Sequence, residues 1–175
     1  MLNVNGPDLG ALEETYVLDA LRSGWITSGP YLDRFERDFA AWVGSRHAVA
    51  CCSGTAALWA ALMALDLPAG ANVAVPAFAC DALANAVLVA GHQPLVLDVE
   101  GLTWALSEET VKPRLFVKAD ALKASAVILV HTYGVPALGT ETIAEWCRSR
   151  RIPLIEDASE AHGATLNGQR VGSIG

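Results

Sequence analysis

The sequence has no apolar run long enough to cross a lipid bilayer. Its longest run, Ala56–Leu65, falls far short of the roughly 20 residues that a spanning helix needs. Residues 1–10 also lack the basic segment followed by an apolar segment that marks a secretory signal. The hydrophobic fraction of 53% and the mean hydropathy of +0.34 therefore predict a dense buried core, and we expect a cytoplasmic protein without a membrane partner.

Basic residues are few and scattered. Twelve Lys and Arg against nineteen Asp and Glu give a formal net charge of −7, and no stretch is rich in Lys or Arg. Such a chain cannot neutralise a phosphate backbone well, so we expect no nucleic-acid partner. Cysteines are also few: Cys51, Cys52, Cys80 and Cys147 include no Cys-x-x-Cys pair. Adjacent cysteines suit one tetrahedral metal poorly, so we expect buried thiols and no metal site.

Several familiar catalytic motifs are absent. The sequence contains no Gly-x-Gly-x-x-Gly, no Gly-x-Ser-x-Gly and no His-Glu-x-x-His. Gly134 and Gly139 have the spacing of a phosphate-loop ATPase, but Thr140-Glu141 stands where Lys followed by Ser or Thr is required. These absences exclude the corresponding dinucleotide, serine-hydrolase, zinc-protease and ATPase sites.

Two kinds of segment alternate along the chain. Apolar residues at helical spacing predict helices over residues 9–22, 31–43, 55–65, 81–90 and 140–150, with a short one near 107–111. Short runs rich in Val and Ile predict buried strands over residues 48–51, 72–75, 94–98, 126–131 and 153–156. This order predicts an α/β fold of three layers, with helices on both faces of a mostly parallel sheet. Asn167-Gly168 predicts a two-residue hairpin turn, and no composition change marks a domain boundary.

The residues that follow each strand are the candidate site residues, because open parallel sheets bind ligands beyond the carboxyl ends of their strands. In Ser53-Gly54-Thr55, the glycine lets the backbone approach a ligand closely. The start of the following helix would stabilise an anion such as a phosphate. The alternative is that Ser53 or Thr55 only caps the helix, which is the commoner role of these residues.

Two further strand ends carry polar residues. In Ile155–Gly163 an apolar strand delivers Glu156 and Asp157, and Asp157 is the candidate to keep the nitrogen of a pyridine cofactor protonated. The alternative is a loop acid that caps or turns the chain. For His131-Thr132-Tyr133-Gly134 we favour a turn over a pocket wall.

Taken together, these stretches resemble the DegT/DnrJ/EryC1/StrS family of pyridoxal-phosphate (PLP) dependent sugar aminotransferases, which have the aspartate aminotransferase type (fold type I) architecture. The resemblance covers essentially the whole chain, and the quoted motifs occur in order at the expected separations: residues 24–30, 47–58, 76–78, 130–134 and 156–164. It implies that residues 1–175 are the N-terminal portion of the PLP-binding large domain, incomplete and without the small C-terminal domain.

The resemblance also assigns roles in the cofactor site. It implies that Gly54 and Thr55 bind the cofactor phosphate, that Asp157 pairs with the pyridine nitrogen, and that Glu160 lies near the ring hydroxyl. Many members stack an aromatic side chain on the ring at the position that matches Cys80. A thiol would stack less well, and Phe78 is the alternative.

The Schiff-base lysine of the family lies beyond a Gly-Ser-x-Gly-Asp segment, and this sequence ends at Gly172-Ser173-Ile174-Gly175. Lys112, Lys118 and Lys123 all precede the aspartate motif, so no catalytic residue is assigned and the chain alone is expected to be inactive. The implied reaction of the complete enzyme transfers an amino group, commonly from glutamate, to a keto sugar nucleotide in amino-sugar biosynthesis by a homodimer. The alternatives are a PLP-dependent sugar dehydratase of the same fold and a non-catalytic binding relative.

Overall fold

The computed structural model describes residues 6–116 and 123–175 of the chain. These residues belong to two compact units. The first consists of the residues up to 42 together with 46–50, and the second consists of residues 43–45 and 51–175. In residues 6–116 and 123–175, no helix is both long and apolar enough to cross a membrane.

The first unit is built on helices α1 (Ala11–Ser23) and α2 (Pro30–Val43). The Glu13 carboxylate accepts a hydrogen bond from the N–H of Gly10 at 2.8 Å, which caps the start of α1. Gly24 ends this helix with a φ of +77°, as the sequence predicts for a glycine C-cap. The two helices also contact one another, because the hydroxyl of Tyr31 donates to Asp19 at 2.8 Å.

The strand predicted over residues 48–51 is wrong. In the described structure these residues form no strand. The N–H of Ala50 donates to the Glu36 carboxylate at 2.9 Å, so a side chain takes the place of a neighbouring strand. Val49 is 80% exposed, whereas a residue of a buried strand would be covered.

The prediction of buried thiols is wrong for three of the four cysteines. Cys51 and Cys52 lie in or beside this irregular stretch and are exposed, and Cys80 is exposed in the turn after β1. Only Cys147 is buried, in helix α6. The four cysteines all lie within the described residues and form no disulfide there.

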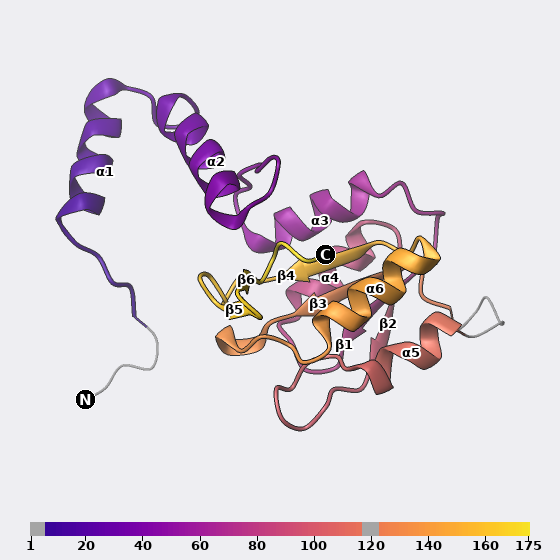
Figure 1. The fold of residues 1–175 in the computed structure, drawn as a ribbon. Coiled ribbons are helices and arrows are strands. Elements are labelled where there is room, and N and C mark those ends of the chain that lie inside the picture. Colours follow the sequence, from indigo (N-terminus) through magenta and orange to yellow (C-terminus); the bar gives the residue numbers. More distant parts are fainter. Residues whose placement is uncertain (1–5, 117–122) are drawn as a thin grey trace. The chain divides into compact units, whose positions relative to one another are not determined.

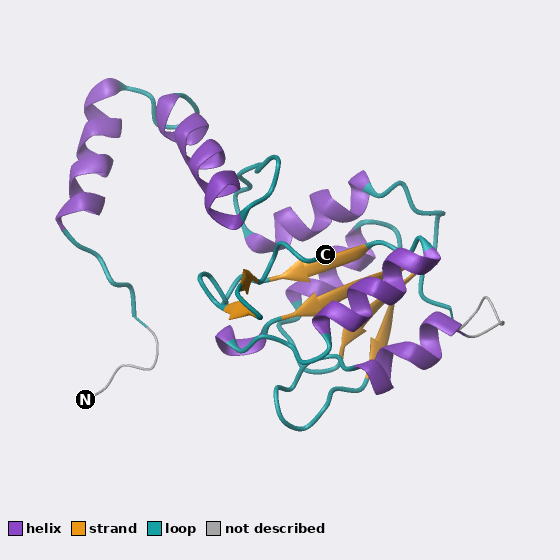
Figure 2. Cartoon of the chain, in the orientation of Figure 1, coloured by secondary structure: helices purple, strands orange, loops and turns teal. Residues whose placement is uncertain are grey.

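The second unit contains a four-stranded parallel sheet, drawn in orange in Figure 2. Its strands are β1 (Asn72–Pro76), β2 (Gln93–Leu97), β3 (Ala126–Val130) and β4 (Leu154–Asp157), in the order β2-β1-β3-β4. Helix α3 (Gly54–Ala64) precedes β1, and the strands are connected in turn by α4 (Ala82–Val89), α5 (Glu108–Phe116) and α6 (Thr140–Arg150). The parallel register runs, for example, from Ile128 opposite Ile155 to Val130 opposite Asp157.

Helices cover both faces of this sheet (Figure 1). Successive side chains of a strand point to opposite faces. Accordingly, Ala126 and Ile128 of β3 pack in the core cluster of α3 and α4, whereas Val127 and Leu129 pack in that of α5 and α6. The predicted three-layer αβα fold with a mostly parallel sheet is confirmed.

Helix α5 and the C-terminal hairpin are of the predicted types, and α5 is longer than predicted. Helix α5 runs on through Pro113 to Phe116, beyond the short helix expected there. Strands β5 (Thr165–Leu166) and β6 (Gln169–Arg170) form the predicted antiparallel hairpin. Its turn residues Asn167 and Gly168 have φ of +50° and +82°, the left-handed conformations that a type I′ turn requires.

Candidate cofactor site

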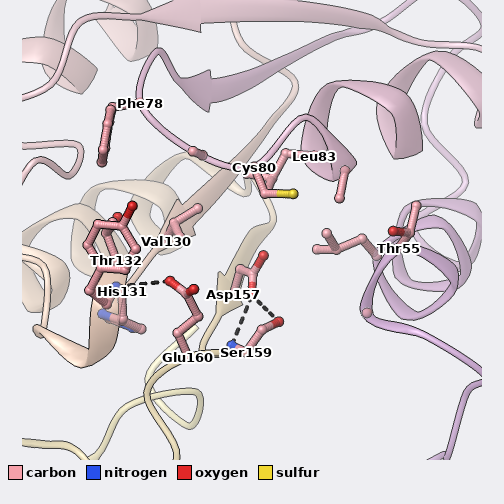
Figure 3. Close-up of a pocket in the computed structure, with 15 residues that line it drawn as sticks. Thr55, Phe78, Cys80, Leu83, Val130, His131, Thr132, Asp157, Ser159 and Glu160 are labelled. Atoms are coloured by element: carbon pink, nitrogen blue, oxygen red, sulfur yellow. Dashed lines mark hydrogen bonds between the residues drawn. The ribbon is translucent and has the colours of Figure 1, made fainter. Parts of the chain in front are cut away.

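A pocket of about 490 Å³ lies at the carboxyl ends of the strands in the second unit (Figure 3). Its walls come from the turn before α3, the turn between β1 and α4, and the segments that follow β3 and β4. All five residues that the sequence assigns to a cofactor line it: Gly54, Thr55, Cys80, Asp157 and Glu160. Residues more than a hundred positions apart in the sequence are thus brought into one cavity at the strand ends, although no strand precedes Gly54 and Thr55 in the described residues.

The N-terminus of helix α3 forms one end of the pocket. Ser53 is its N-cap, and the Ser53 hydroxyl accepts from the N–H of Ala56 at 3.1 Å. The N–H groups of Gly54 and Thr55 have no intrahelical acceptor, and no other acceptor in the described part of the chain binds them. Capping and anion binding are therefore compatible: Ser53 caps the helix, and two amides with the positive end of the helix dipole remain for a ligand.

Asp157 ends strand β4 and is held in a fixed orientation. Its Oδ1 accepts from the N–H of Ser159 at 3.0 Å and from the Ser159 hydroxyl at 2.5 Å (dashed in Figure 3). Its carbonyl accepts from the N–H of His131 at 3.0 Å, which ties it to the end of β3. The two side-chain bonds use only one carboxylate oxygen, so the other is available to a ligand in the pocket.

The segment after β3 forms both a turn and a pocket wall. Residues Thr132–Gly134 make a single 3₁₀ turn, and Thr132 and Tyr133 also line the pocket. The Glu160 carboxylate accepts from the N–H of Tyr133 at 3.0 Å, and Tyr133 has a left-handed φ of +52°. The sequence pattern predicts only the turn, although the position of these residues at a strand end also favours a place in the pocket wall.

Thr132 also carries an unmet hydrogen-bonding group. Its side chain is buried, and its Oγ1 has no hydrogen-bond partner among the described residues. Buried polar atoms are almost always paired in native proteins, and an unpaired one needs an explanation. A ligand in the pocket would supply the missing partner.

The turn between β1 and α4 contributes Phe78 and Cys80 to the pocket. The Cys80 thiol donates to the carboxylate of the next residue, Asp81, at 3.4 Å. The Phe78 ring lies 4.8 Å from that of Trp104 and 6.3 Å from that of Tyr133, measured between centroids. The pocket therefore offers a thiol at the position expected for ring stacking and an aromatic ring two residues earlier.

Two lysines lie away from this pocket. The Lys112 ammonium lies 5.2 Å from the centroid of the Trp146 ring on α6, and the Lys123 carbonyl accepts from the side chain of Asn72 at the start of β1. Lys118 lies outside the described residues. Within residues 6–116 and 123–175, no three His, Cys, Asp or Glu side chains are grouped to hold a metal ion.

A buried hydrogen bond between a histidine and a carboxylate adjoins the pocket. His131 Nε2 lies 3.0 Å from Glu156 Oε2, and the two side chains are 0% and 2% exposed. Burial raises the pKa of Glu156, but hydrogen bonds from His131 and from the backbone of residues 172, 174 and 175 outweigh it and hold that pKa below its usual value. Neither role could be predicted from the sequence, because each side chain depends on a partner far along the chain.

The arrangement of the parallel sheet, the start of α3 and Asp157 can be compared with known proteins. The model of the DegT/DnrJ/EryC1/StrS aminotransferase family matches residues 7–175. The chain belongs to this family. The GDP-perosamine synthase of Vibrio cholerae is 36% identical over 176 residues, which cover 100% of this chain and 46% of that protein. The chain thus spans about half the length of the curated relatives it matches.

Solved structures of similar proteins agree with the fold. The aminotransferase from Psychrobacter cryohalolentis is 32% identical, with a TM-score of 0.84 over 95% of this chain and 41% of its own. A GDP-4-keto-6-deoxymannose-3-dehydratase holding a trapped PLP-glutamate geminal diamine is 26% identical, with a TM-score of 0.86 over 97% of this chain and 44% of its own. The fold is therefore that of a partial fold type I domain.

Proposed function

We propose that this chain forms the phosphate-binding and pyridine-binding walls of a PLP site. The observation that carries the proposal is the convergence of the α3 N-terminus and Asp157 on one pocket. A pocket of about 490 Å³ is within the usual range for small cofactors, roughly 300–1,000 Å³. The solved relative that contains a PLP adduct supports the choice of ligand.

The residues present suit the chemical groups of PLP. The N–H groups of Gly54 and Thr55 would bind the phosphate, and the orphaned hydroxyl of Thr132 would donate to a polar group on the ring. Asp157 would hold a proton at the pyridine nitrogen, and Glu160 lies on the wall proposed to face the ring hydroxyl. When bound, the cofactor supplies an electron sink for reactions at an amino-bearing carbon.

We infer that the complete protein transfers an amino group, with glutamate as the proposed donor, to a keto sugar nucleotide in amino-sugar biosynthesis. The name of the Vibrio cholerae relative, GDP-perosamine synthase, supports this substrate class. The dehydratase structure favours a second candidate, a PLP-dependent sugar dehydratase, because it has the same fold. The chain alone should not transaminate, because no lysine lies among the described residues of the pocket to act as nucleophile and base.

We propose a homodimer as the working form. Exposed apolar side chains on the first unit support a protein partner, since Leu9, Leu12, Val17 and Leu21 are each 59% exposed or more. Large apolar side chains left exposed in this way are what a protein interface would cover.

Protection of Cys80 from alkylation tests the cofactor site. We use pyridoxamine phosphate as the probe, because it has no aldehyde to react with surface lysines. Its binding should slow the reaction of Cys80 with iodoacetamide at least fivefold, whereas Cys51 and Cys52 do not line the pocket and serve as internal controls. Mass spectrometry of the labelled peptides gives the three rates.

Two comparisons make this test specific. Pyridoxamine without its phosphate should protect Cys80 far less, because the α3 amides then have no anion to bind. The Asp157→Asn variant should raise the half-protecting concentration about tenfold, in keeping with a charge-assisted hydrogen bond. Equal alkylation of Cys80 with and without the probe would refute the proposed site.

A further inference from the structure

The carboxylate of Glu156 accepts four hydrogen bonds, two at each oxygen. Oε2 receives the Nε2–H of His131 at 3.0 Å and the N–H of Gly172 at 2.9 Å. Oε1 receives the N–H of Ile174 at 2.6 Å and that of Gly175 at 2.5 Å. Two acceptor positions on each oxygen are thereby filled, so this buried carboxylate is fully satisfied by one side chain and one short stretch of backbone.

The tautomer of His131 follows from its second contact. The N–H of Ala137 donates to His131 Nδ1 at 3.1 Å, so Nδ1 carries no proton. The ring proton is therefore on Nε2 and points at Glu156. All four groups that contact the carboxylate are then hydrogen-bond donors. This arrangement fits an ionised Glu156, because the proton of a neutral carboxyl group would point at another donor.

The backbone of residues 172–175 approaches β4 unusually closely. Gly172 has a φ of +84°, and a Cβ there would lie 3.3 Å from Cβ of Ala158. A Cβ on Gly175 would lie 3.0 Å from the carbonyl oxygen of Leu154. Glycine at both ends thus lets three N–H groups converge on one carboxylate, an arrangement that elsewhere binds anions such as phosphate.

We infer that residues 172–175 form a backbone anion receptor whose resident anion is Glu156, and that His131 orients this carboxylate. Glu156 is then a positioning residue: it holds the segment 172–175 against β4 beside the pocket. Neighbouring side chains of a strand point to opposite faces, so Asp157 reaches the pocket while Glu156 reaches the receptor. The inference stands on these contacts and does not depend on the proposed cofactor.

The Glu156→Gln variant of the 175-residue chain tests this role. Gln keeps the shape but replaces one oxygen by an NH₂ group, which cannot accept a hydrogen bond. Amide hydrogen exchange, followed by NMR on the ¹⁵N-labelled protein, should lose protection about tenfold or more at Gly172, Ile174 or Gly175. The β3 amides of Ile128 and Leu129 should keep theirs, because their bonds are within the sheet.

Glu141→Gln is the matched control. The Glu141 carboxylate accepts from the Asn167 side chain at 2.9 Å, so it contacts the hairpin that precedes residues 172–175, and no bond to those residues is present among its described contacts. This variant should leave the three amides unchanged. Unchanged protection in Glu156→Gln, or an equal loss in Glu141→Gln, would overturn the inference.

A measurement on the unaltered chain covers the case in which Glu156→Gln fails to fold. Couplings across the hydrogen bonds should link the amide nitrogens of Ile174 and Gly175 to Cδ of Glu156. The ¹⁵N shifts of His131 should show a protonated Nε2 and an unprotonated Nδ1. Absence of the couplings, or the opposite tautomer, would show that Glu156 is not held in this receptor.

Discussion

Thr132 combines burial with an unmet hydrogen bond at the pocket wall. It is 7% exposed, and its Oγ1 finds no partner in the described part of the chain. Leaving such a hydroxyl unpaired costs about 1–3 kcal/mol, so the unliganded protein is less stable than it would be with a partner present. Ligand binding would recover part of this cost.

Replacing Thr132 by Val should therefore weaken the binding of pyridoxamine phosphate about fivefold, corresponding to one neutral hydrogen bond of about 1 kcal/mol. The unliganded variant should be as stable as the original or more so, because Val has nearly the same shape and no orphaned hydroxyl. The concentration dependence of Cys80 protection gives the affinity. Thr132→Ser keeps the hydroxyl and should bind almost normally; equal weakening in both variants would indicate a packing effect.

From the sequence alone, pocket residues could be predicted where their position along the chain marks them, whereas contacts that depend on a distant partner could not. Asp157 ends strand β4 and Gly54 and Thr55 begin helix α3, and all three line one pocket although no strand precedes α3 in the described residues. Glu156 depends on amides from residues 172–175, and no local pattern reports that distant contact. Cys80 lines the pocket where an aromatic ring was expected to stack, and the alkylation experiment tests its role.

Among the secondary-structure elements, β3 is the most completely buried. It lies between β1 and β4, and its residues Ala126 to Leu129 are each 0% exposed. Four consecutive apolar residues made this strand predictable, because a strand with both faces covered loses the alternation of polar and apolar residues. Residues 48–51 have a similar pattern but pair with no strand in the described structure. The pattern of residues alone cannot predict whether a pairing partner is present.

Truncation of Ile128 to Ala should destabilise the second unit by about 3 kcal/mol. The side chain is 0% exposed in the core cluster beneath α3 and α4, so its removal leaves a cavity as well as losing apolar contacts. Urea unfolding of the two proteins gives the difference. Leu102→Ala, at a side chain that is 77% exposed, should change stability by less than about 0.5 kcal/mol.

Across the whole molecule, acid should weaken the fold partly through Glu156. Its pKa is lower in the folded protein than the usual value of 4.5, so the unfolded chain binds the proton more readily. The stabilisation is fully present above about pH 4.5 and is lost as the pH falls through the lower folded pKa.

The comparison with Glu156→Gln isolates this contribution. The difference in unfolding free energy between the original protein and the variant should be constant from pH 7 to about pH 5.5 and shrink below about pH 4.5. Urea titrations at several pH values measure it. A difference that stays constant down to pH 3 would mean that Glu156 does not titrate as the hydrogen bonds require.

The strands of the sheet all run in one direction, so the segments that leave β1, β3 and β4 emerge at one edge and supply most of the pocket wall. Phe78, Cys80, Ser159 and Glu160 of these segments belong to neither of the core clusters on the two faces of the sheet, whereas Ala79 packs against one of them. Mutation can therefore explore new ligand preferences in a few short loops at little cost to folding. Architecture and recognition can evolve separately in this protein, the first under selection for packing and the second under selection for chemistry.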